Sequence, residues 1–82
     1  MQRGGEHVQT LDITLNGTTD VSSFVNLSNR YAFPIALRQG RATIDGKSLL
    51  GILSLNLARP ITVEVYDSKC QDFLDALAPY VQ

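Results

Sequence analysis

The chain has 82 residues, a formal net charge of −1 and a single cysteine, Cys70. A chain of this length forms one small domain with one core. The lone cysteine excludes an internal disulfide and is typical of a reducing compartment. The near-zero charge offers no concentrated basic face for nucleic acid or for an acidic membrane surface.

No segment is typical of a secretory signal, and no apolar run is long enough to cross a bilayer. We therefore expect a cytoplasmic protein that binds neither membranes nor nucleic acid directly. Residues 1–6 are polar with paired glycines and are expected to be flexible. Residues 7–82 are expected to form a single domain.

The first predicted element is a strand over residues 8–15. Its second half alternates, with Leu11, Ile13 and Leu15 on one face, which is typical of a strand with one buried face. Residues 16–20 (Asn-Gly-Thr-Thr-Asp) follow as a turn that ends in three candidate helix N-cap residues.

A helix and a hairpin are predicted next. Apolar residues at helical spacing indicate a helix from Val21 to about Tyr31, and Pro34 blocks its continuation. Residues 33–37 alternate like a strand, and a tight turn after them leads to a short strand near residues 42–44.

The last third contains a short helix, a strand and a final helix. Ser48 is the predicted N-cap of a helix that ends near Leu53. After Pro60, residues 61–66 alternate clearly and predict a strand. A helix is expected from Ser68 onward, with an apolar stripe of Cys70, Phe73, Leu74, Leu77 and Val81.

The element order is therefore βαββαβα. Three helices in so short a chain cannot each bury an apolar stripe separately. We therefore predict an α+β open-faced sandwich, in which the three helices pack on one face of a four-stranded antiparallel sheet and share one core.

A phosphate-binding loop is the first interpretation suggested by Gly46, Lys47 and Ser48. A Walker A loop requires a further glycine five residues before Gly46, and that position is Arg41. The surrounding residues also resemble a strand rather than a loop. The nucleotide-binding hypothesis therefore fails.

The alternative treats Ser48 as a helix N-cap beside an exposed apolar surface. The apolar residues at 49, 50, 52 and 53 cover nearly the whole circumference of a short helix, so Leu50 and Leu53 are expected to face solvent. An N-cap serine needs no function beyond capping. The same position also favours a covalently attached phosphate, and exposed apolar residues beside it indicate a docking surface.

Residues 46–55 resemble the regulatory segment of HPr, the histidine-containing phosphocarrier of the sugar phosphotransferase system. The similarity is greatest to the Gram-positive form, in which a kinase phosphorylates the serine corresponding to Ser48. Further matches are Asn16-Gly17 after the first strand and Phe24-Val25 in the first helix. The resemblance extends over about residues 8–81 and implies the HPr fold, an open-faced sandwich.

The sequence departs from HPr at the active site. The family pattern Leu-His-x-Arg-Pro follows the Asn-Gly turn, whereas this chain has Thr18, Thr19 and Asp20 in a degenerate loop without histidine, arginine or proline. A phosphocarrier needs a nucleophile that is also a good leaving group, which imidazole supplies. The hydroxyls of this loop would form inert esters, and Asp20 would repel an incoming phosphoryl group. We expect no carrier activity.

Few other residues are candidates for chemistry. His7 precedes the first strand and is interpreted as incidental, with a relocated carrier site as the alternative. Cys70 is interpreted as a core residue rather than a reactive thiol. No residue set has metal-ligand spacing or a nucleophile–base arrangement, so neither a cofactor nor an enzymatic activity is expected.

The resemblance therefore implies an HPr-like regulatory or adaptor protein, similar to a catabolite-repression HPr that lacks the histidine. Ser48 is the expected regulatory phosphorylation site, and the partner-binding residues are Lys47, Leu49, Leu50 and Leu53. Expected partners are an HPr kinase-like enzyme, a transcriptional regulator or a component of the phosphotransferase system. The alternatives are a phosphocarrier with a non-standard site and an interaction domain that is not phosphorylated.

Overall fold

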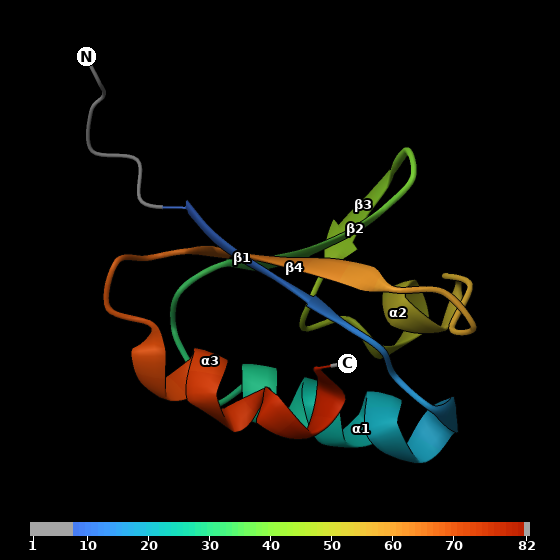
Figure 1. Ribbon diagram of the computed structural model, residues 1–82, viewed down its shortest axis with the longest axis horizontal. Helices are drawn as coiled ribbons and strands as arrows, with labels where there is room; N and C mark the ends of the chain where they lie inside the picture. The colour runs from blue at the N-terminus through green and yellow to red at the C-terminus, as the bar shows by residue number, and fades with distance from the viewer. Residues whose placement is uncertain (1–7, 82) are drawn as a thin grey trace.

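A computed structural model describes residues 8–81 and confirms the predicted βαββαβα order, with one added 3₁₀ helix at the end (Figure 1). The predicted flexible start, residues 1–6, and His7 lie outside the described residues. None of the described helices is long and apolar enough to cross a membrane. The elements are β1 (Val8–Ile13), α1 (Gly17–Ser28), β2 (Ile35–Gln39), β3 (Ala42–Asp45), α2 (Leu49–Leu53), β4 (Ile61–Tyr66), α3 (Gln71–Ala76) and η1 (Ala78–Tyr80).

The four strands form one antiparallel sheet in the order β1-β4-β2-β3. Val8 lies opposite Tyr66 at one end of the β1–β4 pair, and Ile13 lies opposite Ile61 at the other. Helices α1 and α3 lie side by side under one face of the sheet, and α2 lies at one end of the molecule (Figure 1). The α+β open-faced sandwich predicted from the pattern is thereby confirmed.

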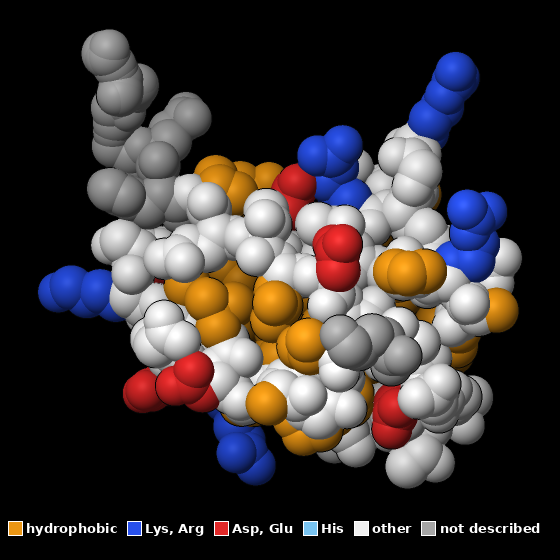
Figure 2. Space-filling view, in the orientation of Figure 1, with side chains coloured by type: hydrophobic (Ala, Val, Ile, Leu, Met, Phe, Trp, Pro, Cys, Tyr) orange, Lys and Arg blue, Asp and Glu red, His pale blue; other side chains and the backbone are white. Residues whose placement is uncertain are grey.

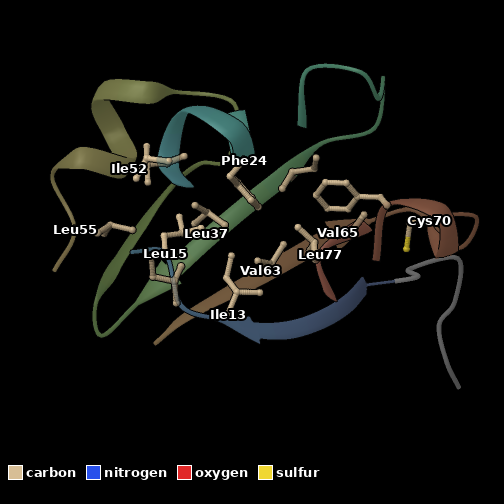
Figure 3. Close-up of a cluster of buried hydrophobic side chains, with 14 residues drawn as sticks. Ile13, Leu15, Phe24, Leu37, Ile52, Leu55, Val63, Val65, Cys70 and Leu77 are labelled. Atoms are coloured by element: carbon tan, nitrogen blue, oxygen red, sulfur yellow. The ribbon is translucent and has the colours of Figure 1, made fainter. Parts of the chain in front are cut away.

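The core lies between the sheet and the helices (Figure 3). The rings of Phe24 in α1 and Phe73 in α3 meet edge to face with their centroids 6.3 Å apart, which joins the two helices. The core residues are Ile13, Leu15, Val21, Phe24, Ile35, Leu37, Ile52, Leu55, Ile61, Val63, Val65, Cys70, Phe73 and Leu77.

Helix α1 begins four residues earlier than the predicted start at Val21, and it ends at Ser28 rather than near Tyr31. Gly17 has φ +80°, a conformation that favours glycine and turns the chain sharply into the helix. At the other end, the N–H of Tyr31 bonds to the carbonyl of Ser28, so the chain tightens into 3₁₀-type bonds there.

The last predicted helix is shorter and interrupted. It begins at Gln71 rather than near Ser68, because the carboxylate of Asp67 accepts the N–H of Lys69 at 2.7 Å and holds the chain in a turn. Pro79 lies in the separate 3₁₀ helix η1. Val81 therefore leaves the predicted apolar stripe and is exposed, whereas Leu77 is buried.

On the helix-free face of the sheet, an unexpected polar cluster surrounds Glu64. The side chain of Arg38 donates to Glu64 Oε2 at 2.9 Å, and Tyr66 Oη donates to Oε1 at 2.8 Å. Glu64 is almost completely buried although its strand position faces away from the core. The hydrogen bond from Arg38, followed by that from Tyr66, lowers the pKa of Glu64 below its ordinary value.

A close backbone approach requires glycine at position 46. The N–H of Gly46 donates to the carbonyl of Ile35 at 2.8 Å, and a Cβ added to Gly46 would lie 2.6 Å from Ile35 Cγ2. This contact holds the end of β3 against the start of β2, immediately before Ser48. The position of Ser48 thus depends on a residue without a side chain.

Replacing Gly46 with alanine should lower the free energy of unfolding by about 1–3 kcal/mol, because the new methyl group overlaps Ile35. Urea denaturation measures the change. Gly51→Ala is the matched control, since its new Cβ would meet mainly the Ser48 side chain and alanine favours the helix. A Gly46→Ala variant as stable as the parent would contradict this packing.

The Glu64 cluster predicts an acid-sensitive part of the stability. Because the folded-state pKa of Glu64 is lowered, its contribution is fully present above the pKa of an unfolded glutamate, about 4.3, and is lost as pH falls through the folded value. The stability difference between the parent and Glu64→Gln should therefore be constant near neutral pH and shrink on acidification. Denaturant unfolding across this pH range measures it.

Arg38→Met provides the matched comparison, because Arg38 is the main cause of the lowered pKa. This variant should raise the pKa of Glu64 toward the ordinary value and weaken the same acid-sensitive component. A difference between the parent and Glu64→Gln that stays unchanged throughout the acid range would show that the ion pair does not act in this way.

Candidate functional site

The opening of helix α1 contains the residues predicted for the degenerate active-site loop. Thr18 and Thr19 are exposed in the first helical turn, and Asp20 is half-buried beside them. Asp20 Oδ2 accepts the backbone N–H of Asn16 at 2.9 Å. The predicted turn over residues 16–20 is thus mostly helical. The Asp20 carboxylate stabilises the start of the helix through this hydrogen bond.

This opening is poorly suited to phosphoryl relay. From Asn16 to Ser23 it offers hydroxyl, amide and carboxylate groups, with neither an imidazole to accept a phosphoryl group nor a guanidinium to hold one. The negative charge of Asp20 lies where an incoming phosphate would need positive charge. His7, the alternative carrier, lies outside the described residues, so the structure does not place it relative to this opening.

Ser48 has the N-cap geometry expected from the sequence. Its Oγ accepts the backbone N–H of Gly51 at 3.1 Å, and its own N–H donates to the carbonyl of Asp45 at 3.1 Å. The side chain is only partly buried. The hydroxyl is therefore held at the first turn of α2 by bonds that leave it at the surface.

Helix α2 exposes its leucines, as its composition indicates. Leu50 is 80% exposed, Leu49 43% and Leu53 40%, whereas Ile52 is completely buried in the core. The predicted solvent-facing positions of Leu50 and Leu53 are thus confirmed. Together Leu49, Leu50 and Leu53 form an apolar surface, here called the leucine patch, beside Ser48.

Lys47 has a contact that sequence reasoning missed. Its Nζ donates to the carbonyl of Tyr31 at 2.6 Å, and its backbone N–H donates to Asp45 Oδ1 at 2.9 Å. The ammonium group therefore satisfies a carbonyl just beyond the C-terminus of α1 and joins this loop to the start of α2. No local sequence pattern indicates a contact between residues so far apart in the chain.

Cys70 and Tyr31 take part in packing rather than in a reactive site. Cys70 is buried, and burial, followed by the nearby charge of Asp67, raises the pKa of its thiol, which disfavours the reactive thiolate. Tyr31 stacks on Phe33 with centroids 5.1 Å apart. Residues 8–81 contain no group of three or more His, Cys, Asp or Glu side chains arranged to hold a metal ion.

Comparison with known proteins shows the family. The family model described as the PTS HPr component phosphorylation site matches residues 20–82, so the match begins at Asp20. A solved structure of the phosphocarrier protein HPr from Bacillus anthracis str. Ames is similar, with 30% sequence identity, a TM-score of 0.70 and coverage of 96% of this chain and 100% of that one.

A second solved structure, HPr-C-His from Thermoanaerobacter tengcongensis, has 18% identity and a TM-score of 0.66 and covers 89% of this chain and 88% of that one. At this identity it supports the fold alone. No curated protein matches the chain significantly. From the family match and the similarity over nearly the whole chain, the protein belongs to the HPr family of the phosphoenolpyruvate-dependent sugar phosphotransferase system.

Proposed function

We propose that this HPr-family protein is a regulatory or adaptor module without histidine phosphocarrier activity, switched by phosphorylation of Ser48. The single observation behind the proposal is the contrast between two helix openings. The opening of α1 has no imidazole, and its Asp20 carboxylate accepts the backbone N–H of Asn16. The opening of α2 has a partly exposed serine beside the leucine patch.

As a member of the HPr family, the protein acts through protein partners of the phosphotransferase system and is not itself an enzyme. The partners proposed for this chain are an HPr kinase-like enzyme, a transcriptional regulator or another component of that system. Lys47 and the leucine patch are the proposed docking residues. Since Lys47 Nζ is bonded to Tyr31, the aliphatic part of its side chain and its local positive charge are what it offers a partner.

The proposed switch is a local change of charge. A phosphoryl group on Ser48 adds about −1.5 to −2 charges and three strong acceptor oxygens. Ser48 Oγ already faces the N–H of Gly51, and a charged acceptor there forms a stronger hydrogen bond than a hydroxyl. Phosphorylation is therefore expected to keep α2 folded and to create, beside exposed leucines, a group that a partner's arginine or lysine can bind.

Incubation with the bifunctional HPr kinase and ATP should add one phosphoryl group to the parent chain and none to Ser48→Ala. Intact-mass analysis measures the product. Ser54→Ala is the matched control, because Ser54 is an exposed serine at the other end of α2 and should leave the reaction unchanged. No mass shift, or one that survives Ser48→Ala, counts against the proposal.

The second test concerns carrier activity. With phosphoenolpyruvate and the general phosphotransferase enzyme, the chain should acquire no acid-labile phosphoryl group, because the described α1 opening has no imidazole. Radiolabel retained after gel filtration, compared with and without acid treatment, measures transfer. An acid-labile label absent from His7→Ala would establish the alternative, a phosphocarrier with a non-standard site.

The other alternative, an HPr-fold interaction domain without a phosphosite in use, differs in its response to variants. It requires a partner complex that is lost in Leu50→Glu and unchanged in Ser48→Ala. The phosphorylation-switch proposal requires both variants to impair the regulated complex. The 80% exposure of Leu50 makes its replacement compatible with folding.

A further inference from the structure

Strand β1 presents an open edge of the sheet. Within residues 8–81 it pairs with β4 on one side, and no described strand lies on its other side. The sequence of β1, Val-Gln-Thr-Leu-Asp-Ile, contains neither proline nor lysine, which commonly block such edges, and its one charged side chain, Asp12, accepts the hydroxyl of Thr62 in β4 at 2.7 Å. Its free backbone groups are therefore suited to hydrogen-bond another extended chain.

A shallow, partly apolar groove lies beside Thr10 and Leu11, between β1 and helix α3. It has a volume of about 560 Å³, and Leu11, Leu74, Ala78 and Val81 supply its apolar lining. Figure 2 shows hydrophobic side chains gathered in the hollow between β1 and α3, left of centre. Val81 is exposed there, where the chain becomes extended after the 3₁₀ helix η1.

The free edge of β1 is limited at one end, and the groove beside it has an acidic residue in its lining. Beyond the end of β1, the N–H of Thr14 bonds to the carbonyl of Tyr80 at 2.8 Å, so η1 occupies that position. Asp75 is the one charged residue among the described residues that line the groove, and Asp72 is exposed on the same helix. A basic segment would complement these carboxylates.

We propose that the β1 edge and this groove bind an extended, basic segment of a partner protein as an additional strand of the sheet. Main-chain hydrogen bonds to β1 would align the segment. Its alternate apolar side chains would lie in the groove over Leu11 and Leu74, because successive side chains of a strand point to opposite faces. A flanking arginine or lysine would lie near Asp75.

This surface is independent of the proposed Ser48 switch. β1 and β3 are the opposite edges of the sheet, and Ser48 follows β3. A segment bound at β1 therefore leaves Ser48 and the leucine patch accessible, so one molecule could contact two partners. Either proposal can fail without the other, and the variants below show which one has failed.

The test uses a synthetic heptapeptide, acetyl-Arg-Thr-Val-Thr-Val-Thr-Arg-amide, titrated into the ¹⁵N-labelled full chain; in a strand its valines and arginines share one face. Amide shifts mapped onto β1 and α3 locate binding and give its Kd. Two further peptides have N-methyl groups on one or the other alternate set of amides. Only one set faces β1 in an added strand, so that peptide should bind at least about tenfold more weakly, and the other within about twofold of the parent.

Variants of the chain test the charge and the location. Asp75→Lys should weaken binding of the arginine peptide about two- to fivefold and favour a version with glutamate in place of arginine. Leu50→Glu and Ser48→Ala, which alter the other surface, should bind the peptide as the parent does. Circular dichroism confirms that each variant is folded.

Four results would overturn the proposal. The first is absence of shifts in β1. The second is equal binding of the two N-methylated peptides, which would indicate contact without strand pairing. The third is unchanged binding to Asp75→Lys. The last is β1 shifts that depend on the concentration of the chain alone, which would assign the edge to a second copy of this protein.

Discussion

Strand β4 is the constraint on which the other parts of the fold depend. It lies between β1 and β2, and its inward residues Ile61, Val63 and Val65 have no exposed surface. Burial of each such side chain is worth about 1.5–3 kcal/mol, so these three positions hold the sheet against α1 and α3. On the other face, Arg38 and Tyr66 satisfy Glu64, which allows a carboxylate to be nearly buried at the centre of the sheet.

The packing of α2 against this framework leaves a surface for partners. A helix of five residues can direct only part of its circumference to the core, and Ile52 occupies that part. The leucine patch consequently faces solvent next to the N-cap serine. Two contacts hold the segment immediately before Ser48. Gly46 packs against Ile35, and Lys47 Nζ donates a hydrogen bond to the carbonyl of Tyr31. The segment that precedes the candidate regulatory residue is thus held by one backbone contact and one side-chain hydrogen bond.

The two helix openings use polar side chains differently. Asp20 supports the start of α1 by accepting the N–H of Asn16, so a carboxylate has a structural role in a position where relay chemistry would need a cationic environment. Ser48 supports the start of α2 with a neutral hydroxyl, which can accept a modification and remain a hydrogen-bond acceptor. Under the proposed function, this difference separates lost relay chemistry from retained regulation within one HPr fold.

The surfaces proposed for binding also differ in kind. The leucine patch is a set of side chains on a short helix, whereas the β1 edge offers backbone groups with a partly apolar groove beside them. The leucine patch lies on α2, which contacts β3, so the two surfaces lie toward opposite edges of the sheet. A small domain with a single core can therefore present two chemically distinct contacts without any change in its packing.

Local patterns were enough to predict the element order and the inward faces of the strands, because residues 61–66 alternate and apolar residues recur at helical spacing after Val21. The sequence also predicted Ser48 as an N-cap, because serine favours that position, and the exposure of Leu50, because so short a helix cannot turn all its apolar residues to one core. It misplaced the start of α1 and the end of α3, where Asp20 and Pro79 act through specific geometry.

Contacts between residues far apart in the chain could not be predicted from these local patterns. Three features depend on segments that the fold brings together. They are the ion pair of Arg38 with Glu64, the hydrogen bond from Lys47 to Tyr31 and the groove beside β1. Side-chain alternation specifies which face a residue occupies, but strand order and register specify its neighbours on that face. Local patterns therefore predicted the fold and the capping role of Ser48. Tertiary packing determined the contacts that surround them.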